Sequence, residues 1–294
     1  MKDNYQTSEH KVRELFPKDL ALIPDSPDKI FVKGNIRSNQ TRIAVVGTRK
    51  ASKLGQETAY NFSYNLAQNG ITIVSGLALG IDSSAHLGAL DAKGVTWSVL
   101  ANGLDDVYPH SNKKIAQRIL ENDGCLISEY SGKTPAYPNQ FILRNRIISG
   151  LCQAILVIEA PEKSGSLATA NFAKKQNRKI FVVPGPIDCL NFIGSNNLIK
   201  EGAVLTTSYL DILKSIGMME KRPLDKSKSS DLPTDNQKII QAIVKLGKEA
   251  NIDNLSKVTK LTPQEIIFQI TPLIIEGIVV EEGGKYRLRG RLKI

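Results

Sequence analysis

From residue 42 onward, short runs of β-branched and apolar residues alternate with stretches in which apolar positions recur every three or four residues. The first pattern is typical of buried strands and the second of amphipathic helices. We expect strands at 42–47, 71–76, 95–101, 125–128, 154–160 and 180–185, and helices at 53–69, 81–92, 112–122, 139–151, 166–177 and about 207–216. Strands that are apolar throughout and separated by helices indicate a parallel sheet covered on both faces.

The two ends of the chain depart from this pattern. Residues 1–40 are polar and punctuated by proline, and we interpret them as a lead-in that packs on the main domain at 41–216. Residues 217–236 combine charge, serine and proline with few apolar positions, which is typical of a linker. Residues 237–294 predict three helices and a hairpin that turns at a pair of glycines, an arrangement that suggests a winged helix.

Charge and cysteine usage narrow the range of partners. The chain has 39 Lys and Arg against 29 Asp and Glu, a formal net charge of +10. This charge attracts polyanions; a basic protein without such a partner is the alternative.

The three cysteines lie far apart without a C-x-x-C pair, so we expect no disulfide framework or zinc ribbon and a cytoplasmic location. No signal peptide and no membrane helix are expected.

The loop after the first expected strand is the first candidate site, because ligands of open parallel sheets bind outside the carboxyl ends of the strands. GTRKAS at 47–52 offers the hydroxyls of Thr48 and Ser52, the cations Arg49 and Lys50, and the start of a helix, whose free N–H groups favour an anion. An ordinary helix start with exposed basic residues is the alternative.

A second loop of this kind follows the fifth strand. Ser164, Gly165 and Ser166 precede a helix, and such small and hydroxyl-bearing residues let the backbone approach a phosphate closely. A plain helix cap explains the same residues equally well.

The helix at 139–151 places an aromatic residue near cations. Phe141 lies within about one helical turn of Arg144, Asn145 and Arg146. This combination suits unpaired nucleic acid, because bases stack on the ring while arginine holds the backbone. A buried phenylalanine beside two surface arginines is the alternative.

Signatures of catalysis are scarce. Asp82 and His86 stand four residues apart and could form an acid–base pair, although a capping aspartate and a structural histidine are favoured. The chain has no G-x-G-x-x-G fingerprint, P-loop, G-x-S-x-G elbow or metal-spaced His/Cys cluster. The carboxylates of Asp82, Asp105, Glu129 and Glu159 show no obvious pairing in the sequence. We therefore expect no cofactor, no metal and no enzymatic activity.

The C-terminal segment does not look like a reader of duplex sequence. Its expected recognition helix at 263–276 has two Glu and no Lys or Arg, whereas major-groove readers need cations. The C-terminal segment better suits a surface that packs on the rest of the protein or binds a partner. The last strand alternates five cations with other residues, which fits either an auxiliary nucleic-acid strip or a solvated edge strand. These cations are Lys285, Arg287, Arg289, Arg291 and Lys293.

Eight short motifs, taken in order, resemble the DprA/Smf family of DNA-processing proteins over residues 15–216. They are GTR (47–49), SGLALGID (75–82) with His86, NGLDDVYP (102–109), ISEY (127–130), RNRIISGL (144–151), SGSLATA (164–170), VPG (183–185) and GSNNLI (194–199). The C-terminal segment is similar to the small domain that many members carry.

This resemblance implies an extended Rossmann-like, doubly wound, mostly parallel α/β sheet followed by a small winged-helix-like domain. It implies a homodimer that binds single-stranded DNA, protects it and delivers it to the RecA recombinase during natural transformation. The residues expected to contact DNA are Arg49, Lys50, Ser52, Lys113, Lys133, Phe141, Arg144, Asn145, Arg146, Ser164, Gly165 and Ser166. The chain departs from the family at Ile142, where proline is common, and at His110 and Pro138, where basic residues are common; Lys113, Lys114 and Lys133 could compensate.

Two other functions compete with this one. Related Rossmann-like proteins cleave nucleotides, but the P-G-G-x-G-T loop of such phosphoribohydrolases is missing from this chain. A winged-helix transcriptional regulator is the third possibility, and the cation-poor helix at 263–276 argues against it.

Overall fold

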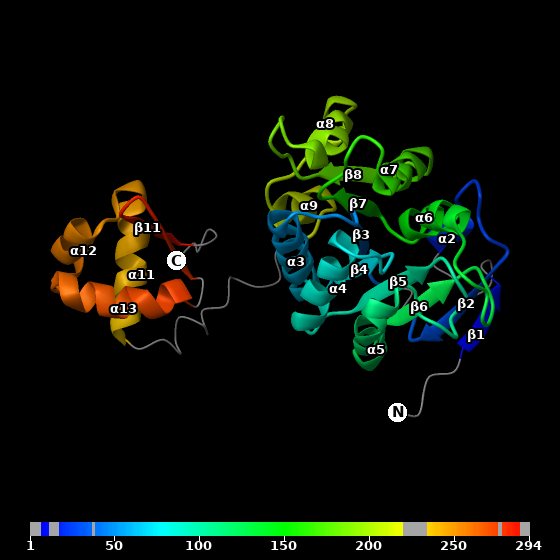
Figure 1. The fold of residues 1–294 in the computed structure, drawn as a ribbon, viewed down its shortest axis with the longest axis horizontal. Coiled ribbons are helices and arrows are strands. Elements are labelled where there is room, and N and C mark those ends of the chain that lie inside the picture. Colours follow the sequence, from blue (N-terminus) through cyan, green and yellow to red (C-terminus); the bar gives the residue numbers. More distant parts are fainter. Residues whose placement is uncertain (1–6, 12–17, 37–38, 220–233, 276–277, 289–294) are drawn as a thin grey trace. The chain divides into compact units, whose positions relative to one another are not determined.

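The chain folds into two compact units, Met1–Glu220 and Lys221–Ile294. The computed structural model describes residues 7–11, 18–36, 39–219, 234–275 and 278–288. Within these residues the first unit is built on a nine-stranded sheet, and the second contains three helices and a two-stranded hairpin (Figure 1).

The large sheet has the strand order β1-β2-β6-β5-β4-β3-β7-β8-β9. Its strands are β1 (Thr7–Lys11), β2 (Lys29–Gly34), β3 (Arg42–Val46), β4 (Thr72–Ser75), β5 (Thr96–Leu100), β6 (Cys125–Ser128), β7 (Ala154–Val157), β8 (Lys179–Val182) and β9 (Val204–Leu205). All neighbours from β6 to β9 are parallel, and Ile43 of β3 aligns with Ile73 on one side and Ala154 on the other. The predicted mostly parallel, Rossmann-like α/β sheet is confirmed.

The residues Ile43–Val46 of the central strand β3 show why the strands are mostly apolar, whereas buried polar residues at strand ends, such as Arg42 and Ser75, are hydrogen-bonded. Ala44 and Val46 belong to the hydrophobic core on one face of the sheet, whereas Ile43 and Val45 belong to the core on the other face. Successive side chains of a strand point to opposite faces, and both faces of this sheet are covered. An unbroken apolar run is therefore required, because a polar residue on either side would be buried.

Helices cover both faces of the sheet (Figure 1). The core on one face includes residues of α2 (Lys18–Ala21), α6 (Pro138–Gly150), α7 (Gly165–Lys175) and α8 (Ile193–Lys200). The core on the other face includes residues of α3 (Lys53–Gln68), α4 (Ile81–Asp91) and α9 (Tyr209–Ser215), and α5 (Lys113–Glu121) packs beside α4. Short 3-10 helices at His110–Asn112 and Leu190–Phe192 precede α5 and α8.

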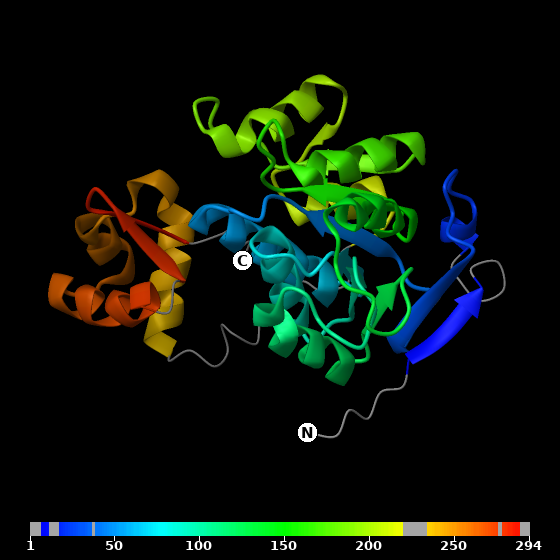
Figure 2. The ribbon, with the colours of Figure 1, turned by 45° about the vertical axis from the view of Figure 1, so that its right-hand side comes forward.

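The N-terminal segment extends the sheet, where we expected only a lead-in packed on the main domain. Strands β1 and β2 pair antiparallel with each other, and β2 pairs antiparallel with β6, with Phe31 opposite Ser128 (Figure 2). The expected strands 154–160 and 180–185 end earlier, at Val157 and Val182. Helix α8 and strand β9 were not expected at all. Strand β9 is only two residues long, too short to show a periodic pattern.

The second unit contains the elements expected of its sequence. These are α11 (Thr234–Leu246), α12 (Ile252–Thr259), α13 (Pro263–Ile275), β10 (Val279–Glu282) and β11 (Lys285–Leu288), with a 3-10 helix at Gly247–Glu249. The hairpin turns at Gly283 and Gly284, whose φ angles of 60° and 72° suit glycine. The winged-helix designation remains a prediction. Arg289, Arg291 and Lys293 of the expected basic strip, and residues 220–233 of the expected linker, lie outside the described residues.

Candidate functional site

A cavity of about 550 Å³ opens at the carboxyl ends of β3 and β7. These two neighbouring strands mark the point where the sheet order reverses, because the following strands run outward from β3 to β6 and from β7 to β9. Ligands of doubly wound sheets bind at such a switch point. The charged residues that line the cavity are Arg49, Lys50, Arg144 and Lys163 against the single acid Asp82. The cavity is therefore suited to an anion.

The loop after β3 carries two of these cations into solvent. Arg49 and Lys50 are exposed, whereas Thr48 between them and the strand is buried. The Thr48 amide donates to the backbone carbonyl of Glu159 at 2.8 Å, and the Lys50 amide donates to the Thr48 hydroxyl at 3.2 Å. The loop is thus held by its backbone, which leaves both cationic side chains available to a ligand.

The helix start beyond this loop already holds an anion, which is the carboxylate of Glu159. This side chain is fully buried. It accepts hydrogen bonds from the Ser52 amide (2.9 Å), the Ser52 hydroxyl and the Asn191 side chain (2.9 Å). A Cβ on Gly55 would lie 2.4 Å from the carboxylate, so only glycine fits there. The expected phosphate site at the start of α3 is therefore occupied by the protein itself.

The start of α7, in contrast, is open. The Ser164 hydroxyl caps the helix by accepting from the Ser166 amide at 3.3 Å. Gly165 is exposed, and a Cβ built on it would meet nothing within 4 Å. The Asn145 side chain donates to the Gly165 carbonyl at 3.1 Å and fixes the turn. Free amide groups at a helix start attract anions, so this end of the cavity suits a phosphate.

Phe141 lies at the other side of the cavity, next to both a cation and a second ring. The guanidinium carbon of Arg49 is 4.7 Å from the centroid of the Phe141 ring. The Tyr108 ring meets Phe141 edge to face at a centroid distance of 5.7 Å. Phe141 is half-buried and Tyr108 is exposed. A flat apolar group can therefore stack here beside a guanidinium.

Arg144 is buried and holds the ends of two strands. Its Nη1 donates to the carbonyl oxygens of Gly76 (2.7 Å) and Val99, and its Nε donates to Asn145 at 3.1 Å. A Cβ on Gly76 would lie 2.6 Å from the guanidinium. Burial lowers the pKa of Arg144 to about 10, although Asp82 opposes the shift and Arg49 adds to it. Arg144 thus stays charged at neutral pH and adds positive potential to the cavity from behind.

His86 is structural, as the sequence favoured, but Asp82 does not cap α4, whose N-cap is Gly80 without a side-chain bond, and instead holds the preceding loop. The Asp82 carboxylate accepts from the amides of Gly76 (3.1 Å) and Ala78 (3.4 Å), and burial raises its pKa despite the opposing charge of Arg144. The Thr96 hydroxyl donates to the Ile73 carbonyl, so His86 Nδ1, at 2.8 Å, must be the protonated nitrogen that donates to Thr96. Burial and the charge of Arg144 lower the pKa of His86 to about 3.

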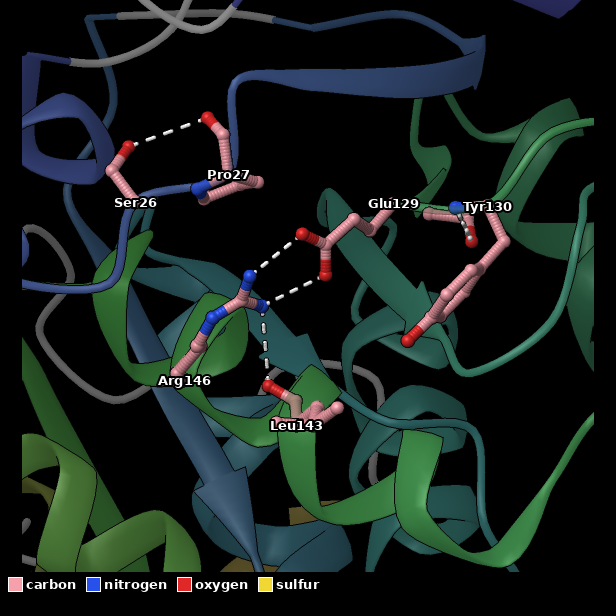
Figure 3. A network of polar contacts seen from close by, with 7 residues as sticks. Ser26, Pro27, Glu129, Tyr130, Leu143 and Arg146 are labelled. Atoms are coloured by element: carbon pink, nitrogen blue, oxygen red, sulfur yellow. Dashed lines mark hydrogen bonds and ion pairs between the residues drawn. The ribbon is translucent and has the colours of Figure 1, made fainter.

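Arg146 points away from the residues that line the cavity and pairs with Glu129. Its guanidinium donates to both carboxylate oxygens, at 2.6 and 2.9 Å, and also to the Leu143 carbonyl at 3.3 Å (Figure 3). The side chains are only 11% and 26% exposed. Glu129 and Glu159, which showed no obvious pairing in the sequence, are thus both engaged by partners distant in the chain.

The structure brings eight of the twelve expected residues together around the cavity. These are Arg49, Lys50, Phe141, Arg144, Asn145, Ser164, Gly165 and Ser166. Four do not line it: Ser52 is bound to Glu159, Arg146 to Glu129, Lys113 forms an ion pair with Asp106 at 3.0 Å, and Lys133 is exposed elsewhere. Thr48, whose hydroxyl the sequence singled out, also lines the cavity. Tyr108 and Lys163 line it and were not expected there, although Tyr108 lies within the NGLDDVYP motif and Lys163 directly precedes SGSLATA.

Metal and membrane sites are missing from the parts of the chain that the structure describes. No group of three or more His, Cys, Asp or Glu side chains is arranged to hold a metal ion in them. None of their helices has the length and hydropathy of a membrane span.

Comparison with known proteins relates most of the first unit to a single family. Residues 10–217 match the family described as DNA recombination-mediator protein A. Protein Smf of Escherichia coli is 36% identical over 283 residues, which cover 94% of this chain and 76% of that protein. DNA processing protein DprA of Streptococcus pneumoniae is 42% identical over 202 residues, which cover 68% of this chain and 71% of the relative.

Solved structures agree with these relatives. The X-ray structure of DprA from S. pneumoniae superposes with a TM-score of 0.66 at 38% identity, covering 72% of this chain and 74% of the other. A structure of DprA from Helicobacter pylori, described as giving insight into a single-stranded DNA binding mode, has a TM-score of 0.65 at 29% identity, covering 74% and 98% of the two chains.

Proposed function

Because this chain belongs to the DNA recombination-mediator protein A family, we propose that its cavity binds single-stranded DNA. The observation that carries the proposal is the contact of Arg49 with Phe141 across the cavity, 4.7 Å from guanidinium carbon to ring centroid. A ring beside a guanidinium offers stacking to an unpaired base and charge to its phosphate, and neither requires a particular sequence. The single-stranded DNA named for the H. pylori relative supports the same ligand.

The proposal extends to the part that each group plays. A base stacks on Phe141, the exposed cations Arg49, Lys50 and Lys163 neutralise the backbone, and the open start of α7 receives a phosphate. Asn145 holds the α7 turn by its bond to the Gly165 carbonyl. Arg144 contributes charge from a buried position, with its Nη1 bound to backbone carbonyls and its Nε bound to the Asn145 side chain.

We propose binding rather than catalysis as the activity. Asp82 and His86 are the residues that come closest to forming an acid–base pair. The side chains of both form hydrogen bonds within the protein. In keeping with the family resemblance, we further propose that the protein acts in the cytoplasm as a homodimer. It would protect incoming single strands and deliver them to the RecA recombinase during natural transformation.

A direct binding measurement tests the proposal. Fluorescence anisotropy of a labelled oligo-dT and of a duplex of the same length, at two salt concentrations, should give tighter binding of the single strand. Its affinity should fall steeply with salt, because each neutralised phosphate contributes a log–log slope of about −0.7. Equal affinity for the two oligonucleotides, or no salt dependence, would overturn the proposal.

A further inference from the structure

The edge of the sheet opposite the cavity gathers the ends of several helices. In a parallel sheet each crossover helix runs back, so the C-terminal ends of α7, α8 and α9 lie near the amino ends of the strands. Printed contacts tie these ends together: Lys179 at the start of β8 donates to the Ser215 hydroxyl at 2.6 Å, and Lys174 lies 3.8 Å from the Glu201 carboxylate. Helices α7 and α8 pack on one face of the sheet and α9 on the other, so these two contacts join neighbouring helix ends around the starts of β8 and β9.

This edge of the sheet is strongly basic. We call it the basic tract, and its cations are Lys174, Lys175, Arg178, Lys179, Lys200 and Lys214. Among the described residues 171–219, the acids are Asp188, Glu201 and Asp211. Asp211 belongs to the first turn of α9 and Asp188 to the loop after β8, so both lie toward the other edge. Of these three acids only Glu201 lies near the cations, where it pairs with Lys174, and Arg178 is half-buried and donates to the Gly150 carbonyl at 3.2 Å.

The tract has more charge than helix stability requires. A cation in the last turn of a helix interacts favourably with the helix dipole, which accounts for Lys200 in α8 and Lys214 in α9. It does not account for a second lysine at the end of α7, or for Arg178 and Lys179, which lie outside helices. Lys175, Lys200 and Lys214 are exposed and make no ion pair within the described residues.

Helix α7 connects the basic tract to the cavity. Its first turn forms the open end of the cavity, and its last turn carries Lys174 and Lys175. Eleven residues at 1.5 Å each span about 16 Å. Asn171 is exposed between the two ends and adds a neutral hydrogen-bonding side chain. A chain that leaves the cavity at the α7 start can thus follow the helix to the tract without meeting an acidic residue of α7.

From this arrangement we infer that the basic tract is a second contact surface for the sugar–phosphate backbone of the strand held in the cavity. The inference rests on the proposed function. Five of the six cations are lysines, which act as point charges and lack the planar fork that reads a defined geometry. They are spread over three helix ends and a strand start, which suits an extended polyanion. The alternative is that the basic tract binds an acidic protein surface, and the test must distinguish this from binding of the DNA backbone.

Oligonucleotide length separates the two contact surfaces. The variant Lys175→Gln/Lys200→Gln/Lys214→Gln removes three exposed charges and no ion pair of the described residues. Anisotropy titrations use oligo-dT of about 6 nucleotides, which fills the cavity, and of about 30, which can also reach the tract. We expect the variant to bind the short oligonucleotide like the wild type and the long one about tenfold more weakly. The log–log salt slope for the long one should be smaller in magnitude by about 2.

A matched control removes the same charge elsewhere. Lys93→Gln/Lys245→Gln/Lys257→Gln takes three exposed lysines from outside the tract, and we expect it to leave both affinities within about twofold at moderate salt. Thermal unfolding of both variants shows whether the fold is intact. Wild-type affinity and salt slope of the tract variant for the long oligonucleotide would overturn the inference, and would point to a protein partner, while the proposed function stands. If the wild type binds neither oligonucleotide, both fall.

Discussion

The guanidinium of Arg49 lies over the ring of Phe141, with 4.7 Å between the guanidinium carbon and the ring centroid. Residue 49 follows the first parallel strand, and residue 141 lies in the first turn of α6 almost a hundred positions later. The contact occupies one face of the ring, and Tyr108 approaches the same ring edge to face. A base that stacks on Phe141 must therefore displace Arg49 or share the ring with it, so the two side chains should act on a bound strand in different ways.

Arg49→Glu should abolish most binding of oligo-dT. The substitution replaces one of four cations in the cavity with a second acid beside Asp82, and removing a phosphate contact also reduces the dependence of affinity on salt. Anisotropy titrations at two salt concentrations measure both effects. The control is Lys93→Glu, an equal change of net charge at another exposed lysine. Wild-type binding by the Arg49 variant would refute the assignment of the cavity.

Phe141→Ala should weaken binding without changing its salt dependence. Stacking of a base on an aromatic ring contributes about 1–3 kcal/mol, so the affinity should fall by about five- to a hundredfold. No charge is altered, and the log–log salt slope should remain that of the wild type. Phe141→Tyr keeps the ring and should retain most of the affinity. A changed slope in the alanine variant would mean that the ring acts by positioning Arg49.

Gly165→Asp should separate stability from binding. Space around Gly165 is open, so the new side chain fits, and an acid in the first turn of α7 favours the helix dipole. The same carboxylate would repel a phosphate at the open helix start. We expect an unchanged or raised melting temperature with at least about a tenfold loss of affinity for oligo-dT. Gly165→Ala is the matched neutral control. Equal binding of oligo-dT by both variants would show that the phosphate does not bind at this turn.

Glu159→Ala should destabilise the protein and loosen the loop that carries Arg49. It would leave the amide and hydroxyl of Ser52 without their acceptor, at up to about 1–3 kcal/mol for each donor. The Asn191 side chain would lose one of its two acceptors and keep the Lys50 carbonyl. Urea unfolding measures the loss of stability, and anisotropy of the folded protein measures the loss of affinity. Glu159→Gln keeps the volume and one acceptor oxygen and should have a smaller effect. If alanine at 159 left both quantities unchanged, Glu159 would not position the loop.

The sequence predicted the layers of the fold better than the pairing of its charges. The β3 residues Ile43–Val46 are apolar because both faces are covered, and that requirement is visible in the local pattern. Residues 1–40 were interpreted only as a lead-in, because β2 (Lys29–Gly34) pairs with a strand that begins at Cys125, far along the chain. Short edge elements have no periodicity of their own.

At the site, the ordered motifs located the right loops but could not assign the direction of each side chain. Arg144 and Arg146 are two positions apart on α6, and consecutive helical positions turn by about 100°. One therefore faces the buried strand ends and the other meets Glu129. Glu159 was noticed as a carboxylate, but its partner Ser52 is 107 residues away. Such contacts exist only after the sheet has brought β3 and β7 together.

The buried state of His86 predicts a pH dependence of stability. Its pKa is about 3 in the folded protein against 6.5 for the free side chain. Between these values the unfolded chain binds a proton and the folded chain does not, so the free energy of unfolding falls as the pH drops below 6.5. From pH 7.5 to 5.5 this group should remove about 1.4 kcal/mol.

Urea unfolding of the wild type and of His86→Asn at both pH values isolates this contribution. Asparagine does not titrate and can still donate to the Thr96 hydroxyl, whereas all carboxylates are common to the two proteins. The wild type should lose about 1.4 kcal/mol more than the variant over this range. Parallel losses in the two proteins would show that His86 titrates alike in the folded and unfolded states and would contradict its burial as a neutral ring.

The carboxylate of Glu159 fills one of the two helix starts at the switch point and leaves the other vacant. With both vacant, the cleft would offer nearly equivalent phosphate cradles on either side of the ring, and a strand could lie across it in either sense. Because Glu159 fills the start of α3 and the start of α7 is open, the two ends of the cleft differ. Under the proposed function, a bound strand would have its phosphate at the start of α7 and not of α3, and a residue that it does not touch would thereby favour one 5′-to-3′ direction.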